Sequence, residues 1–192
     1  ACFDVRHYTL QLDIRPKTRE IEGQLSMRAD ATAKTSTIRL DLENTLQVRS
    51  VTVDGKAADF RHENDKIQIP VALDTGSSFQ VEVKYGGKPR VAPRPPWSGG
   101  FTWKQTKAGL PWIATTCQGE GADIWWPCKD HPSDKPDGMD LHISVPARLY
   151  CATNGKLVSN TKKAGKRHFH WRVSTPISNY CVALNIAPYK VL

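Results

Sequence analysis

The chain has 192 residues, of which 39% are hydrophobic and 24% charged, with a formal net charge of +8 and a sequence pI near 9.3. This composition is typical of a globular protein and excludes a disordered chain, and no apolar run approaches the roughly 20 residues that cross a bilayer. The lysines and arginines are scattered mostly singly, and their densest clusters fall in predicted turns and loops. We therefore expect a solvated basic surface and no nucleic-acid partner.

Two long strands open the chain. Residues 4–14 alternate apolar and polar side chains with period two, and after a short turn the alternation resumes over residues 20–29. Such alternation is typical of half-buried strands, and two of them joined by a short turn predict an antiparallel hairpin. Shorter strands follow at a regular spacing. We therefore predict a strand-rich region over residues 1–85, arranged as a β-sandwich or a large antiparallel sheet.

Proline and glycine interrupt the strands over residues 86–110. Three prolines between positions 93 and 96 exclude a central strand there. We predict a Pro/Gly/Trp-rich loop with one short strand at residues 101–103.

Period-two alternation returns over residues 137–192. Asn154-Gly155 is predicted to close a second hairpin, and the last apolar stretch, residues 180–186, is predicted to be a strand. Because the sequence has no internal repeat and no flexible linker, residues 1–192 are predicted to form a single all-β domain.

The segment of residues 111–136 differs from the strands around it. It contains three of the six tryptophans, two of the five cysteines and four carboxylates, interrupted by glycines and prolines. Buried tryptophan N–H groups and buried carboxylates both need partners, so a plain loop rarely concentrates these residues. We therefore expect the functional site in this segment.

Metal ligation finds no support in the histidine spacing. A hydrolytic zinc site commonly takes two histidines from an HExxH helix, and none of the six histidines lies in such a motif. His168 and His170 share the polar face of a predicted strand, so both are expected to face solvent. His131 is expected to make a hydrogen bond within its loop. We expect no metal to be bound by this chain alone.

Nucleophilic chemistry finds no support either. The sequence contains no GxSxG motif and no catalytic-cysteine signature. The cysteines match no disulfide framework and no zinc pattern, which favours free and mostly buried thiols. They are Cys2, Cys117, Cys128, Cys151 and Cys181.

Polar side chains of the special segment offer two further interpretations. A carboxylate pair for glycoside hydrolysis could form among Glu120, Asp123, Asp130 and Asp134, although spacing in a loop does not determine their separation. Gln118 follows an apolar strand, so its amide could project into a cleft. Its carbonyl, with Glu120 nearby, could then accept hydrogen bonds from a cationic amine, or it could satisfy loop backbone instead.

Two motifs follow one another in this segment: Thr115-Thr116-Cys117-Gln118, and then Trp126-Pro127-Cys128-Lys129-Asp130-His131-Pro132. In order and spacing the pair resembles the N-terminal domain of the aminopeptidase N and leukotriene-A hydrolase family of zinc peptidases. That family shows a Thr-x-(Cys or Phe)-(Gln or Glu) strand end followed by a Pro-Cys-x-Asp-x-Pro loop. The opening residues 4–8 and the stretch 152–155 also look like that domain, so the resemblance covers nearly the whole chain.

The resemblance implies a saddle-shaped all-β domain that packs on a zinc-containing catalytic domain of the same polypeptide. It implies that Gln118 reaches into the substrate cleft and helps to bind the free α-amino group at the N-terminus of a peptide. Glu120 is a second candidate for this contact. The framework of the cleft wall would consist of Thr115, Cys117, Trp126, Pro127, Cys128, Asp130 and Pro132.

Several parts of that family's active site are missing from these 192 residues. They are the HExxH helix with its distal glutamate ligand, the Gly-x-Met-Glu-Asn strand and any catalytic tyrosine assignable by motif. The chain therefore looks like the first domain of a longer aminopeptidase and is not expected to hydrolyse peptides alone. Because it starts at a strand with no leader, a periplasmic or secreted location is expected.

The main alternative is a free-standing β-sandwich module that binds carbohydrate or protein. Such a module would use exposed tryptophans as stacking surfaces. The candidates are Trp97, Trp103, Trp112, Trp125 and Trp126. The aminopeptidase interpretation predicts instead a surface that is covered by a partner domain, with Gln118 at its edge. A third possibility is a catalytically silent scaffold that binds no ligand.

Overall fold

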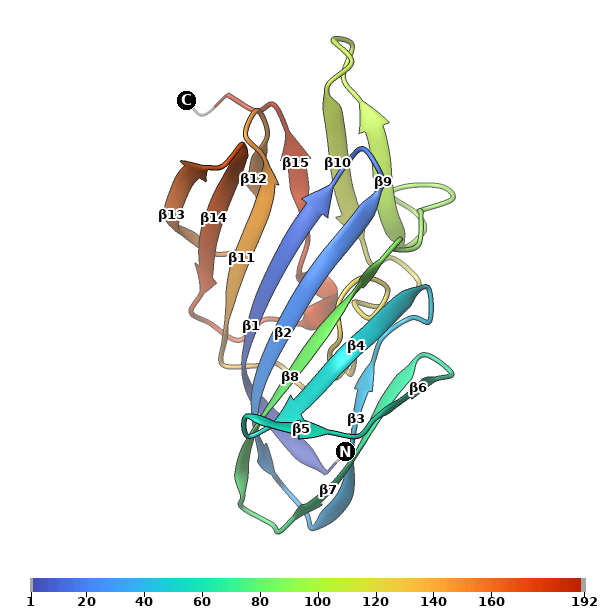
Figure 1. Cartoon of the computed structure of the whole chain (residues 1–192), viewed down its shortest axis with the longest axis vertical. Coiled ribbons are helices and arrows are strands. Elements are labelled where there is room, and N and C mark those ends of the chain that lie inside the picture. Colours follow the sequence, from blue (N-terminus) through green and yellow to red (C-terminus); the bar gives the residue numbers. More distant parts are fainter. Residues whose placement is uncertain (1, 191–192) are drawn as a thin grey trace.

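The computed structural model describes residues 2–190 and confirms the all-β fold class (Figure 1). These residues form fifteen strands and one short 3-10 helix, and the strands are arranged in sheets of eight, four and three. Within this part of the chain, no helix is long and apolar enough to cross a membrane.

The eight-stranded sheet is the largest unit of the fold. It consists of β1 (Phe3–Arg15), β2 (Glu20–Ala31), β4 (Leu46–Val53), β5 (Lys56–Ala58), β8 (Ser78–Gly87), β11 (Gly138–Pro146), β13 (Lys156–Lys163) and β14 (Lys166–Val173). Their order across the sheet is β13-β14-β11-β1-β2-β8-β4-β5. The predicted antiparallel hairpin is confirmed by the pairing of β1 with β2. On its other edge β1 pairs in parallel with β11, which alternation could not reveal because it reports buried faces and not neighbours.

Two smaller sheets complete the fold. The four-stranded sheet has the order β12-β15-β10-β9 and consists of β9 (Gly100–Gln105), β10 (Pro111–Thr116), β12 (Tyr150–Ala152) and β15 (Asn185–Ala187). The three-stranded sheet has the order β3-β7-β6 and consists of β3 (Thr35–Asp41), β6 (Arg61–Glu63) and β7 (Lys66–Leu73). In Figure 1 the first lies toward the top of the view and the second toward the bottom. The short strand predicted within the Pro/Gly/Trp-rich loop is confirmed as part of β9.

The hairpin predicted at Asn154-Gly155 is wrong. The chain passes from one sheet to another there, because β12 pairs with β15 while β13 pairs with β14. The turn that closes the β13–β14 hairpin is Ala164-Gly165, where both residues have positive φ (50° and 74°). Both dipeptides suit a tight turn locally, and only the long-range pairing decides which one joins neighbouring strands.

The strand predicted over residues 180–186 is also largely wrong. Asn179–Cys181 form the 3-10 helix η1, and only Asn185–Ala187 form a strand. The apolar side chains that suggested a strand, Val182, Leu184 and Ile186, are all fully buried. Their alternation results from an extended chain that packs against the core. Only the last residues of this stretch pair with a neighbouring strand.

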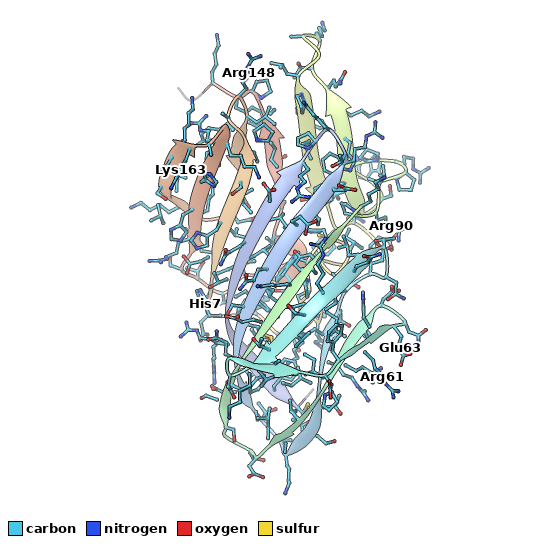
Figure 2. All side chains as sticks on the ribbon, in the orientation of Figure 1. His7, Arg61, Glu63, Arg90, Arg148 and Lys163 are labelled. Carbon is cyan, nitrogen blue, oxygen red and sulfur yellow. The ribbon has the colours of Figure 1, made fainter. Side chains whose placement is uncertain are left out.

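Buried side chains from all three sheets join one hydrophobic cluster. The inner face of the eight-stranded sheet contributes its apolar alternating residues, including Tyr8 and Tyr85. The outer face of this sheet is polar. Basic residues are spread widely, and Figure 2 shows Arg61, Arg90, Arg148 and Lys163 in different parts of the molecule.

Candidate functional site

The segment between β10 and β11 is anchored to the end of β3. The backbones of Asp41 and Cys128 exchange two hydrogen bonds, with N–O distances of 2.7 and 3.1 Å. In addition, the Asp130 N–H donates to Asp41 Oδ2 at 2.8 Å. These bonds join residues nearly 90 positions apart, so the segment has a defined path and is more than a surface loop.

Aromatic packing forms the inside of this segment. The indole rings of Trp125 and Trp126 are fully buried. Trp126 makes an edge contact with Tyr8 at a centroid distance of 5.1 Å, and Trp125 makes one with Phe101 at 6.3 Å. The Tyr85 hydroxyl donates to the Trp125 carbonyl at 3.2 Å. The predicted framework residues Trp126, Pro127 and Cys128 are therefore part of the protein core.

The remaining predicted framework residues lie at the edges of the segment between β10 and β11. The Thr115 Oγ1 accepts a hydrogen bond from the Leu184 N–H at 2.8 Å, which ties β10 to the chain before β15. Asp130 Oδ2 accepts one from the Ala122 N–H at 3.3 Å. Cys117 is buried, and Pro132 lies on the exposed turn of the loop.

The four carboxylates of the segment have different environments. Glu120 forms a bidentate ion pair with Arg90, with distances of 2.9 and 2.6 Å, and the buried Asp134 is paired with Lys129. Burial raises the pKa of Asp123 to about 7, and the neighbouring carboxylates of Asp130 and Asp41 add to this shift. Burial also raises the pKa of Asp130. Two of the four acids are thus compensated by cations, and the other two resist ionisation.

The thiols and acids of this segment do not fit the zinc of a peptidase. Burial raises the pKa of Cys117 to about 11 and that of Cys128 well above its ordinary value, so both thiols are protonated in the metal-free protein. Among the described residues, no three His, Cys, Asp or Glu side chains of this segment lie close enough together to hold a metal ion. His131 is engaged locally, because its Nδ1 lies 2.7 Å from the Ser133 Oγ. This confirms the expected loop hydrogen bond. All five cysteines are free, and three of them are buried.

Gln118 lies exposed at the end of β10. Its Oε1 accepts a hydrogen bond from the Tyr180 hydroxyl at 2.7 Å. Tyr180 comes from η1, 62 residues further along the chain, and no sequence signal pointed to it. A surface cavity opens beside this pair, and its lining includes Tyr180, Glu120 and His131. The structure therefore places Glu120 and the loop around Asp130 at one concave surface, and Gln118 is linked to it through Tyr180.

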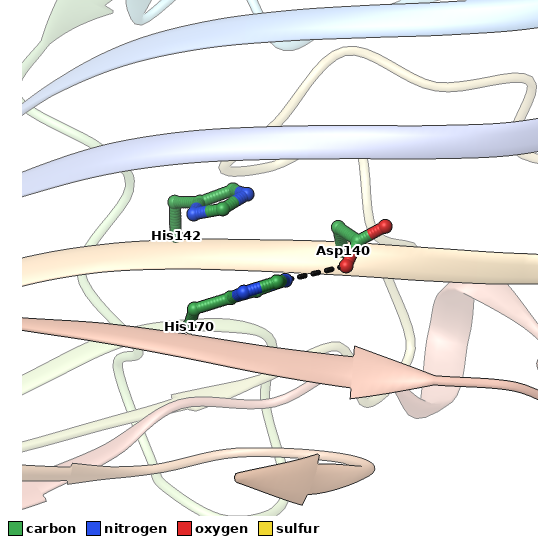
Figure 3. A group of neighbouring side chains, drawn as sticks. All are labelled: Asp140, His142 and His170. Atoms are coloured by element: carbon green, nitrogen blue, oxygen red, sulfur yellow. Dashed lines mark hydrogen bonds and ion pairs between the residues drawn. The ribbon is translucent and has the colours of Figure 1, made fainter. Parts of the chain in front are cut away.

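The sequence predicted that His168 and His170 of β14 face solvent, but in the structure both are half-buried and contact polar side chains. His170 Nε2 lies 2.5 Å from Asp140 Oδ1, and its ring stacks on that of His142 with centroids 4.2 Å apart. His168 Nδ1 lies 2.8 Å from the Ser144 Oγ. Figure 3 shows Asp140, His142 and His170 gathered on β11 and β14. The histidine pattern along the chain missed this group because it forms across strands.

The surroundings of Asp140 lower the pKa of its carboxyl group, whereas those of Asp123 raise it. Burial opposes ionisation of Asp140, but hydrogen bonds from His170, Arg172 and His7 outweigh it and lower its pKa to about 2. Burial lowers the pKa of His142, and the neighbouring His170 adds to this effect.

The tryptophans do not form the stacking platform of the carbohydrate-binding alternative. Trp125 and Trp126 are buried in the core, and Trp103 is half-buried with its ring stacked on Phe101. Only Trp97 and Trp112 are exposed, at 73% and 36%.

Comparison with known proteins gives consistent matches. The family model of the peptidase M1 N-terminal domain matches residues 5–181. The chain is 24% identical over 198 residues to a leukotriene A-4 hydrolase of Xenopus laevis, and the match covers 95% of this chain and 31% of that protein.

Solved structures of an M1 zinc metallopeptidase from Deinococcus radiodurans share this fold. One matches with a TM-score of 0.82 and 25% identity, and covers 96% of this chain and 42% of that chain. A second, of a mutant bound to a Tyr-Ser-Ala substrate, has a TM-score of 0.81 and 26% identity at the same coverage. The chain thus spans less than half the length of these relatives.

Proposed function

The chain belongs to the family of peptidase M1 N-terminal domains, and from this premise we propose that it forms one wall of the substrate cleft of a zinc aminopeptidase. The parent enzyme removes residues from the N-termini of peptides. Residues 1–192 act in it as one β-domain, which is supported by the single hydrophobic cluster that joins the three sheets.

The hydrogen bond between Tyr180 and Gln118 is the observation that carries this proposal. A glutamine carbonyl has two lone pairs, and the tyrosine hydroxyl occupies one of them. The other is free to accept a hydrogen bond from the ammonium group of a peptide N-terminus. In this arrangement Tyr180 is the donor and the Gln118 oxygen is the acceptor. Tyr180 also lines the neighbouring cavity, which supports a role for Gln118 beside it.

Glu120 has a secondary part in this scheme. Its carboxylate is neutralised by Arg90, so it offers a substrate amine less net charge than a free carboxylate would. It contributes mainly by shaping the loop beside Gln118. The buried residues Trp126, Pro127 and Cys128 hold the wall in place and contact no substrate.

Zinc and the activated water belong to the part of the parent enzyme that lies outside these 192 residues. The wall described above offers no fitting ligand set for that zinc, so the isolated chain is inactive. A solved relative binds a Tyr-Ser-Ala substrate, which supports a peptide as the ligand of this cleft. The catalytic domain of the same polypeptide is the expected partner for the exposed surface around Trp97 and Trp112.

The proposal is tested in the full-length parent enzyme with Gln118→Ala. We expect kcat/KM to fall for aminoacyl substrates with a free α-amine, by roughly 10- to 100-fold, as for the loss of one hydrogen bond to a charged group. The rate of N-blocked substrates is expected to change little. Gln105→Ala, which removes an exposed amide at the end of β9, is the matched control.

Equal losses for free and blocked substrates would contradict amine recognition by Gln118. Separately, the 192-residue chain is assayed with a chromogenic aminoacyl substrate and added Zn²⁺. Turnover that co-purifies with the chain and disappears with chelator would contradict its expected inactivity.

A further inference from the structure

The polar face of the eight-stranded sheet brings together side chains that are far apart in sequence. His142 on β11 lies directly opposite His170 on β14, and Asp140 lies two residues before His142 on the same face. Opposed residues on neighbouring strands have Cβ atoms about 4.5–5.5 Å apart, and residues i and i+2 share a face. Such a triangle of side chains on a sheet is a compact arrangement of possible ligands.

The donor atoms of this triangle converge. One ligand atom from each of Asp140, His142 and His170 lies within 4.8 Å of the other two. In Figure 3 both imidazole rings extend along β11 toward the Asp140 carboxylate, and the two rings are nearly parallel, at 18°. Tetrahedral coordination with bonds of about 2.0–2.1 Å requires donor atoms roughly 3.3 Å apart. Closing the site therefore requires the ligand atoms to approach one another, and the two rings to tilt out of their stacked arrangement so that their lone pairs point at one ion.

We propose that Asp140, His142 and His170 form a binding site for a divalent transition-metal ion, with Zn²⁺ as the probe. Two imidazoles and one carboxylate suit Zn²⁺, Co²⁺, Ni²⁺ and Cu²⁺, whereas Mg²⁺ and Ca²⁺ prefer oxygen ligands. The ion takes the place of the proton between His170 Nε2 and Asp140 Oδ1. Water completes the coordination on the solvent side. This inference opposes the expectation from histidine spacing that the chain binds no metal.

The surroundings of the three residues support ligation. His7 Nε2 lies 3.0 Å from Asp140 Oδ2, the carboxylate oxygen that does not contact His170. His7 therefore orients the carboxylate as outer-shell partners do at metal sites. Within residues 2–190, the His142 side chain makes no hydrogen bond that a metal would have to break. The ligands are partly buried, and an open hollow lined by His142 and His168 gives solvent access to His142.

Arg172 is the feature that opposes binding. Its Nε donates to Asp140 Oδ1 at 2.9 Å, and its positive charge repels an incoming cation. The side chain is 55% exposed, so it can swing into solvent at small cost. Replacing Arg172 with an uncharged residue should therefore increase the affinity for the metal ion.

His168 could form an alternative ligand set with His170. It lies two residues from His170 on β14, so the two could chelate an ion as a simple His-x-His pair without His142 or Asp140. In the structure His168 is bonded to Ser144 and lines the hollow beside the cluster. A His168→Gln variant is therefore the matched control for the two histidine ligands.

The test is calorimetric titration of the 192-residue protein with ZnCl₂, with MgCl₂ as the negative control. We expect one Zn²⁺ per chain and a rise in Tm on saturation. His142→Gln and His170→Gln are each expected to weaken binding more than the roughly 10- to 100-fold typical of losing an outer-shell partner. His168→Gln should leave the affinity within about threefold. Arg172→Gln should tighten binding by roughly twofold to fivefold, the size of one partly exposed charge interaction.

A second measurement does not depend on whether the variants fold. Paramagnetic Co²⁺ is added to the unmodified protein, and the histidine ring signals are followed by nuclear magnetic resonance. The signals of His142 and His170 should broaden first, those of His7 and His168 next, and those of His62 and His131 last. Absence of saturable Zn²⁺ binding would overturn the proposal. So would loss of binding in His168→Gln but not in His142→Gln, or broadening that begins at His62 or His131.

Discussion

Asp123 in the segment between β10 and β11 and Asp140 on the polar face of the sheet are both partly buried, yet their pKa values move in opposite directions. The pKa of Asp123 rises to about 7, because burial and the nearby Asp130 and Asp41 all oppose its charge. The pKa of Asp140 falls to about 2, because His170, Arg172 and His7 donate hydrogen bonds to it. Burial acts in the same direction on both. The donors that surround the carboxylate therefore decide its charge state.

The two regions also differ in how they are held together. The segment between β10 and β11 is held by fully buried rings and by backbone hydrogen bonds. The polar face is held by side chains that contact each other across strands. Packing in the core therefore dominates the first region, and side-chain electrostatics dominates the second. Three predictions test this difference, and each changes one region.

The largest effect is expected from Trp126→Ala in the segment between β10 and β11. Removing this fully buried indole, which packs on Tyr8, should destabilise the fold by about 3–5 kcal/mol. Urea unfolding followed by circular dichroism measures the change. Trp97→Ala is the control, because that ring is 73% exposed and its loss should cost less than about 0.5 kcal/mol. Equal losses of stability in the two variants would contradict the role of Trp126 as a core residue.

An intermediate effect is expected from Asp140→Asn on the polar face. The folded-state pKa of this group lies below its ordinary value of 3.8, so its ionised form contributes stability above about pH 4. That contribution is lost as pH falls toward 2. The variant should be less stable than the unmodified protein by about 1–2 kcal/mol at pH 7, since solvent screens part of the effect, and the difference should shrink below pH 4. Urea unfolding across this pH range measures it, and a difference independent of pH would contradict the ion-pair account.

The smallest effect, with the opposite sign, is expected from Asp123→Asn. The pKa of this acid is raised in the folded state, so the unmodified protein loses stability as pH rises from about 4 to 7 and then levels off. The variant lacks this loss and should be more stable by about 1 kcal/mol at pH 8, since partial exposure screens the effect. At pH 4 the two proteins should have similar Tm values. A destabilised variant at pH 8 would mean that the charged carboxylate has a partner in the wall.

The sequence selected one segment as the candidate site, through the motif ending at Gln118 and the loop from Trp126 to Pro132. In the structure, Asp130, His131 and Pro132 of this loop line a cavity together with Glu120. The assignment of Gln118 to amine recognition stays a prediction. The partners of Gln118 and Glu120 were not accessible from the sequence. Tyr180 and Arg90 lie 62 and 30 residues from the side chains they bind, and neither has a local signal that marks it.

The amino-acid sequence by itself determined which face of most strands is buried and where most strands end, because alternation and turn residues act through local backbone geometry. It could not determine which strands are neighbours. The parallel pairing of β1 with β11 and the passage of the chain between sheets at Asn154-Gly155 depend on contacts between remote segments. The same holds for Asp140, His142 and His170, which meet only because β11 and β14 pair in one register. A shift of one residue would send the His170 ring to the other face.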